Sequence, residues 1–193
     1  MTSKKEMVFA PSSSAMVNDE SVNDLIAAGS MGNDVDVTFL KYSQNGQWLY
    51  GADEDVLDSG EVLYIDASTF VAGSILWEGG QVKDEDCQPF SQRANIRMIE
   101  GADAFLGVNM RAVEDGKDFS YKPSSLGGKK FIQKLMLEVG LGLKAHGNDK
   151  IAMVTLDGGS YKNKKHGGKT FFPTFAIVGW AGPDGVEIKK LAA

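Results

Sequence analysis

The chain has 193 residues, the length of one ordinary domain, and its 42% hydrophobic and 24% charged side chains exclude wholesale disorder. Its 23 glycines and 5 prolines favour short strands and tight turns, and they argue against an all-helical bundle. The net charge of −6 hides a gradient: residues 1–119 carry 8 basic and 21 acidic side chains, whereas residues 120–193 carry 12 and 5. Such asymmetry suggests a polyanionic partner for the basic half, unless the fold intermixes the two halves.

The N-terminal part of the chain is predicted to be a loosely ordered arm. Residues 1–33 mix Ser, Asn, Asp, Gly and Ala with scattered apolar residues, and only Val17–Ala28 has the pattern of a short amphipathic helix. We expect residues 34–193 to form a single domain.

A β-rich pattern begins at Val35. The run VDVTFLKYSQNGQWLYG holds two strand-like segments around Asn45-Gly46, which is the strongest short signal of a β-hairpin. The segments EVLYIDAS and FVAGSILWEGGQVKDE follow, with a reversal at Gly79-Gly80. We therefore expect an antiparallel meander over Asp34–Glu85 and two further strands, in ANIRMIEG and AFLGVNMRAVEDG.

One segment, Ser124–Lys144, is predicted to be a helix. Its apolar residues recur at intervals of three and four, which is the spacing of a surface that faces a core. Ser124 or Ser125 is the expected N-cap, and Gly147 the expected stop. The apolar stripe consists of Phe131, Leu135 and Val139, with Ile132, Met136 and Leu143 beside it.

The last predicted elements are two strands, IAMVTLDGGSY and KTFFPTFAIVGWA, joined by KNKKHGG. The sequence therefore predicts a mainly β, β-rich α+β domain with one helix inserted before the last two strands. This order is that of an OB-fold, a small antiparallel Greek-key barrel. A β-sandwich with a decorating helix is the main alternative.

Few residues suit metal binding or covalent catalysis. Cys87 is the only cysteine, which excludes an intramolecular disulfide and a cysteine-based zinc site. The acidic runs Asp53-Glu54-Asp55 and Asp84-Glu85-Asp86 are typical of solvated loops, and a metal-dependent nuclease with converging carboxylates is the alternative. We expect neither enzyme activity nor a cofactor.

The sequence also predicts a cytoplasmic protein without a membrane segment. A single cysteine fits a reducing compartment. No apolar run approaches the roughly 20 residues that span a bilayer, and the start MTSKKEMVFAPSSSA lacks the continuous apolar core of a secretory signal.

The densest candidate site is Gly158–Pro173, a basic loop bracketed by aromatic residues. Single-stranded nucleic acid is held by this combination, because lysines neutralise phosphates and aromatic rings stack on unpaired bases. The alternative is a hairpin tip whose lysines only keep a sheet edge soluble. The residues concerned are Tyr161, Lys162, Lys164, Lys165, His166, Lys169, Phe171 and Phe172.

Two Gly-Gly-Lys sequences raise the question of a nucleotide-binding P-loop. Neither completes that motif; in Gly167-Gly168-Lys169, which Thr170 follows, Asn163 stands where the first glycine is required. Lys129 and Lys130, at the start of the predicted helix, remain candidates for an additional phosphate contact. They oppose the helix dipole there unless an anion compensates.

Tryptophans in the β-rich segments are candidates for base stacking. By alternation Trp48 shares a face with Tyr50, so the two form the best predicted platform, and Trp77 is the next candidate. The alternative for each tryptophan is packing in the core.

Four segments are distinctive when they are taken together: NGQWLYGADED, STFVAGSILWEGGQV, YKPSSLGGKKFIQKL and GGSYKNKKHGGKTFFPTFAIVGW. With these segments the chain resembles a family of small proteins of tailed bacteriophages, either DNA-binding or uncharacterised. The resemblance covers roughly residues 36–182. It implies a phage origin and, in function, a single-stranded-DNA-binding protein with an OB-like domain.

We therefore expect a protein that binds single-stranded DNA without sequence specificity and protects replication or recombination intermediates. We expect it in the host cytoplasm, alone or as a homo-oligomer. Phage or host replication or recombination proteins are the further partners. The alternative is a protein-interaction module that docks through the acidic meander. The predicted DNA-binding residues are Trp48, Tyr50, Trp77, Lys129, Lys130, Tyr161, Lys162, Lys164, Lys165, Lys169 and Phe171.

Overall fold

A computed structural model describes residues 37–79, 81–163, 168–182 and 187–188 of the chain. The predicted arm over residues 1–33, including the helix expected at Val17–Ala28, lies outside the described residues. The described part contains an 11-stranded sheet, an α-helix labelled α2 (Leu126–His146), and two 3₁₀ segments, η1 (Ala67–Thr69) and η2 (Phe90–Asn95). The strands are β1 (Thr38–Tyr42), β2 (Trp48–Tyr50), β3 (Asp55–Val56), β4 (Val62–Ile65), β5 (Phe70–Glu78), β6 (Gln81–Pro89), β7 (Asp103–Ala112), β8 (Asp118–Tyr121), β9 (Ile151–Asn163), β10 (Gly168–Ala181) and β11 (Glu187–Ile188).

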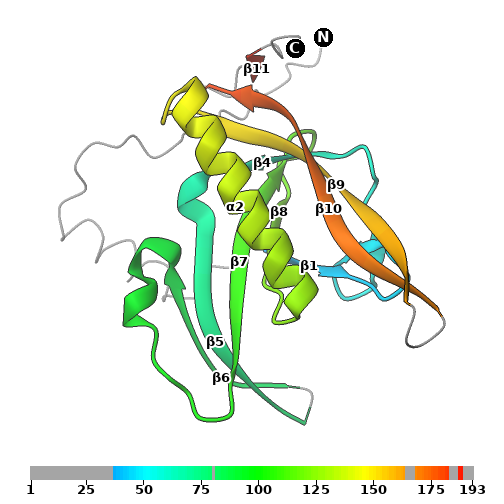
Figure 1. Ribbon diagram of the computed structural model, residues 1–193, viewed down its shortest axis with the longest axis vertical. Coiled ribbons are helices and arrows are strands. Elements are labelled where there is room, and N and C mark those ends of the chain that lie inside the picture. Colours follow the sequence, from blue (N-terminus) through cyan, green and yellow to red (C-terminus); the bar gives the residue numbers. More distant parts are fainter. Residues whose placement is uncertain (1–36, 80, 164–167, 183–186, 189–193) are drawn as a thin grey trace, which may run out of the picture.

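The sheet curls around α2, which crosses it diagonally (Figure 1). Its strand order is β11-β10-β9-β4-β7-β8-β1-β2-β3, and β5 pairs with both β7 and β6. The predicted fold class is confirmed: the protein is mainly β and barrel-like, with α2 inserted before the last two long strands, β9 and β10. It differs from the expected all-antiparallel barrel in two ways, since the sheet stays open between β3 and β11 and the β1–β8 pair is parallel.

The Asn-Gly hairpin forms as predicted. Tyr42 pairs with Trp48 across β1 and β2, and the amide of Ser43 donates to the carbonyl of Gln47 at 2.8 Å. Gly46 has a φ of +82°, a left-handed conformation that glycine adopts without steric cost. The Asn-Gly pair therefore sets the register of the first two strands.

The predicted meander over Asp34–Glu85 is only partly correct. It holds through β3, but β4 then lies between β7 and β9 rather than beside β3. The strand expected in ANIRMIEG is wrong, because this segment is η2 followed by irregular chain. Arg97 fixes that chain: its carbonyl accepts from Ser74 Oγ, and its guanidinium donates twice to the Asp84 carboxylate. Side-chain hydrogen bonds thus replace a strand ladder here.

The predicted helix is confirmed, with caps at both ends. Ser125 Oγ accepts from the amide of Gly128 at 3.2 Å, and Gly147 ends the helix with a φ of +120°. The buried face consists of Phe131, Ile132, Leu135 and Val139. These residues pack on the concave face of the sheet, in the core that also holds residues of β1, β2, β4, β7, β8 and β9. No helix among the described residues is long and apolar enough to cross a membrane.

Candidate nucleic-acid interface

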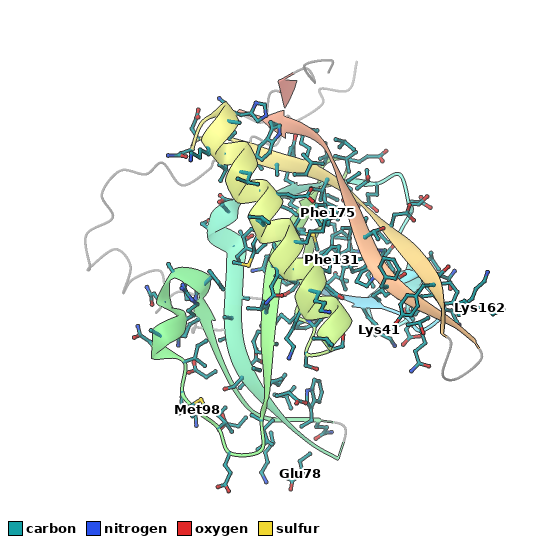
Figure 2. All side chains as sticks on the ribbon, in the orientation of Figure 1. Lys41, Glu78, Met98, Phe131, Lys162 and Phe175 are labelled. Atoms are coloured by element: carbon teal, nitrogen blue, oxygen red, sulfur yellow. The ribbon has the colours of Figure 1, made fainter. Side chains whose placement is uncertain are left out.

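A groove of about 750 Å³ runs between the first half of α2 and the adjacent part of β10. Its floor continues into the core, because the rings of Phe131 and Phe175 meet edge to face with centroids 5.4 Å apart. Figure 2 shows both residues between the helix and the strand. The lining residues are Tyr42, Ser43, Gln44, Tyr121, Ser125, Leu126, Gly127, Gly128, Lys130, Phe131, Lys134, Tyr161, Thr170, Phe171, Phe172, Pro173, Thr174 and Phe175.

The helix side of the groove is basic. Lys130 and Lys134 are exposed and one helical turn apart, so they project along the same side of α2. Lys134 Nζ lies 5.5 Å from the centroid of the Phe175 ring and 3.5 Å from a carboxylate oxygen of Glu138. An exposed ion pair of this length contributes little, so it leaves the Lys134 ammonium available to an anion.

The strand side of the groove is aromatic. Tyr161 and Phe172 lie on the same face of the β9–β10 ribbon with ring centroids 6.1 Å apart, and Tyr161 is 56% exposed. Phe172 lies over Gly159, where a Cβ would collide with its ring. Phe171 lies on the opposite face of the ribbon and packs on Gly46 in the β1–β2 turn. The first hairpin therefore supports β10 from that face.

The charge of the groove is opposite in sign to that of the whole chain. Among the described residues that line it, two are lysines and none is acidic, although the chain has a net charge of −6. Lys162 and Lys169 face each other directly across β9 and β10, beyond the groove and near the end of the ribbon. Like charges at opposed positions are unfavourable without a counter-ion, so this pair also favours an anionic ligand.

Two tyrosines form the inner end of the groove. Tyr42 Oη is buried and has no hydrogen-bond partner among the described residues, and burial, together with the Asp157 carboxylate, raises the pKa of Tyr42. Tyr121 is only 5% exposed, and burial, followed by Tyr42, raises its pKa as well. Both hydroxyls therefore stay protonated at neutral pH and can donate hydrogen bonds.

The predicted platform of Trp48 and Tyr50 is wrong. Trp48 is 4% exposed, its indole N–H donates to the carbonyl of Asp157 at 2.9 Å, and its ring packs against Tyr121 and Phe131. Tyr50 is half-buried against Phe119, with the ammonium of Lys117 over its ring at 4.0 Å. Alternation places the two on one face, and the curl of the sheet turns that face inward.

Two other predicted residues lie apart from the groove. Trp77 is 53% exposed but stands beside Glu78 at the end of the β5–β6 hairpin, far from Lys162 in Figure 2. Lys129 turns away from Lys130, because its ammonium donates to the carbonyl of Ala104 on β7. Lys164 and Lys165 lie outside the described residues.

The structure thus brings together Lys130, Tyr161 and Phe171 from the predicted set, with Lys162 and Lys169 near them. Sequence reasoning missed Tyr42, Tyr121, Lys134 and Phe175 as groove residues. Only Lys134 gave a usable signal, since it follows Lys130 by one helical turn on the polar side of the predicted stripe.

The acidic runs show no grouping suited to a nuclease metal. Glu54 pairs with Lys41, Asp84 with Arg97, and Glu85 with Lys122. No group of three or more His, Cys, Asp or Glu in the described part of the chain is arranged to hold a metal ion.

Comparison of the chain with protein-family models, with curated proteins and with solved structures found no match. Only the geometry and charge of the groove therefore indicate a function.

Proposed function

We propose that the protein binds single-stranded DNA, without strong sequence preference, in the groove between α2 and β10. The observation that carries this proposal is the combination of lysines, aromatic rings and no acidic lining residue in a groove of a net acidic chain. Lysines supply contacts to the phosphates, and rings supply stacking that is independent of base identity.

The aromatic wall supports stacking on unpaired bases. The exposed rings of Tyr161 and Phe172 are tilted by 38° to each other, so successive bases can lie against each ring in turn. Stacking of this kind contributes about 1–3 kcal/mol per base. A base in a duplex offers no free face, and this geometry therefore favours single strands.

The lysines give the strand a path. Lys130 and Lys134 lie on one side of the groove, and the Lys162–Lys169 pair extends the basic surface along the ribbon. A strand on this path stays away from the acidic hairpin that ends at Glu78 (Figure 2). The cellular role that fits is protection of single-stranded replication or recombination intermediates, in a host cytoplasm if the chain is phage-encoded as its resemblance implies.

Paired substitutions test the proposal. We expect Lys130→Ala/Lys134→Ala and Phe172→Ala each to weaken binding of labelled oligo-dT by about tenfold in fluorescence anisotropy. The controls are Lys144→Ala, on the last turn of the same helix, and Trp77→Ala, an exposed aromatic on the other hairpin. Equal effects of the groove and control variants would reject the groove as the binding site.

A second candidate function is protein docking on the β5–β6 side. Trp77, Val82 and Met98 are large exposed apolar residues in a region with several acidic side chains, and Met98 is 94% exposed. Capture of a replication protein that is lost in Trp77→Ala/Met98→Ala, with no binding of oligo-dT by the unaltered protein, would favour this function over DNA binding.

A further inference from the structure

The first turn of α2 carries hydrogen-bond donors from which no group in the described part of the chain accepts. Ser125 caps the amide of Gly128, and its carbonyl accepts from Lys129. No hydrogen bond from the amides of Leu126 and Gly127 is seen among the described residues, as is usual at a helix start. Gly127 is exposed and lacks a side chain that could shield its amide. These amides border the groove.

The hydroxyl of a buried tyrosine lies beside the same turn. Tyr121 lines the groove with 5% of its surface exposed, and no hydrogen bond of its Oη is seen within the described part of the chain. This oxygen would lie 3.0 Å from a Cβ built on Gly128, so it borders the helix start. A hydroxyl without a protein partner at the edge of the groove can donate a hydrogen bond to a ligand there.

The charges of this turn are reversed from the usual arrangement. The first turn of α2 contains no acidic residue but carries Lys129 and Lys130. Cations near a helix N-terminus are unfavourable because they meet the positive end of the dipole. An anion bound at this end of the helix would be attracted by both the dipole and the lysines, so the arrangement would become favourable. Of the two lysines, Lys130 lines the groove.

From these features we infer that the groove binds one nucleotide as a unit: its phosphate at the first turn of α2, between the Tyr121 hydroxyl and the Lys130 ammonium, and its base against Phe171, which lies on the same face of β10 as Phe175. This inference rests on the proposed function and adds a fixed phosphate position to it. The groove volume of about 750 Å³ lies within the range of small-ligand pockets. A DNA strand that binds without sequence preference would then keep a fixed position along the groove through one anchored phosphate.

Thymidine monophosphate, thymidine and inorganic phosphate are the probes for this inference. In amide NMR spectra we expect the monophosphate to shift Gly127 and Gly128, and to bind at least about tenfold more tightly than thymidine or phosphate alone. Tyr121→Phe, which removes only the hydroxyl, and Lys130→Ala should each weaken the monophosphate about tenfold and leave the weak binding of thymidine unchanged. Tyr50→Phe and Lys144→Ala are the controls.

The outcomes separate this inference from the proposed function. If oligo-dT binds but thymidine binds as tightly as its monophosphate, or if Tyr121→Phe has no effect, the anchored phosphate is rejected and DNA binding stands. If the monophosphate binds as expected while oligo-dT does not, the anchored phosphate stands and DNA binding is rejected. Binding of neither ligand rejects both.

Discussion

The edge-to-face contact of Phe131 and Phe175, at 5.4 Å and an interplanar angle of 90°, joins α2 to β10 beneath the groove. Phe131 is 4% exposed and belongs to the main core, so the groove floor is as rigid as the core itself. The floor is consequently close-packed before any ligand binds, which lowers the entropic cost of binding.

The close packing of α2 on β10 predicts opposite effects for two neighbouring glycines. A Cβ on Gly142 would overlap the Trp180 ring, whereas a Cβ on Gly140 meets nothing within 4 Å. We expect Gly142→Ala to lower the free energy of unfolding by about 1–3 kcal/mol through overpacking. Gly140→Ala should raise it by up to about 1 kcal/mol through helix propensity. Urea unfolding measures both, and a Gly142→Ala protein as stable as Gly140→Ala would contradict this packing.

The first hairpin is predicted to hold Phe171 in place. Gly46 has a φ of +82°, and a Cβ there would lie 2.5 Å from Cδ1 of Phe171. Gly46→Ala should therefore destabilise the protein by about 1–3 kcal/mol and weaken oligo-dT binding as Phe171 is displaced. Gly60→Ala, where a Cβ meets nothing, is the control and should change stability by less than about 0.5 kcal/mol. Unchanged DNA binding by folded Gly46→Ala would show that Phe171 does not contribute.

The three tryptophans should differ in their access to a soluble quencher. Trp77 is 53% exposed, Trp48 is 4% exposed, and Trp180 is half-buried. In an iodide titration, Trp77→Phe should remove most of the quenchable emission, whereas Trp48→Phe should remove emission that iodide does not reach. Trp48→Phe should also cost about 1–3 kcal/mol of stability, because the carbonyl of Asp157 loses its indole donor. Strong quenching of Trp48 would restore it as a stacking candidate.

Arg97 gives stability a defined pH dependence. Its guanidinium lowers the pKa of Asp84 below the ordinary 3.8, and its backbone N–H lowers that of Asp86. Both carboxyl pKa values are lower in the folded than in the unfolded protein. The contribution of the two carboxylates to the free energy of unfolding is therefore complete above pH 3.8, and it is lost as the pH falls through the folded pKa values. Carboxyl ¹³C titrations should show Arg97→Ala raising the pKa of Asp84, with Arg93→Ala as the control that leaves it unchanged. An Asp84 pKa that is ordinary in the unaltered protein would contradict the ion pair.

Local sequence signals predicted the elements well. Asn45-Gly46 indicated the hairpin because a left-handed glycine is required there, and the stripe through Phe131 and Leu135 indicated the face of α2 that is buried. Both signals depend on neighbours within a few residues, which the sequence displays directly.

The site was less predictable, because it depends on contacts between distant segments. Alternation shows that Trp48 and Tyr50 share a face but not that the curled sheet turns this face toward α2. Tyr121 gains its role only because β8 ends beside the start of α2. The amino-acid composition indicated the basic residues of the β9–β10 ribbon. The groove, by contrast, forms only where β10 packs beside α2.

The direct test of DNA binding in the groove is a salt titration of oligo-dT binding, followed by fluorescence anisotropy. We predict binding at low salt whose association constant falls linearly with salt on logarithmic axes, and a smaller slope for Lys130→Ala/Lys134→Ala but not for Lys144→Ala, since each neutralised phosphate releases counter-ions. No binding at low salt, or an association constant independent of salt, would contradict the proposal that this groove holds single-stranded DNA.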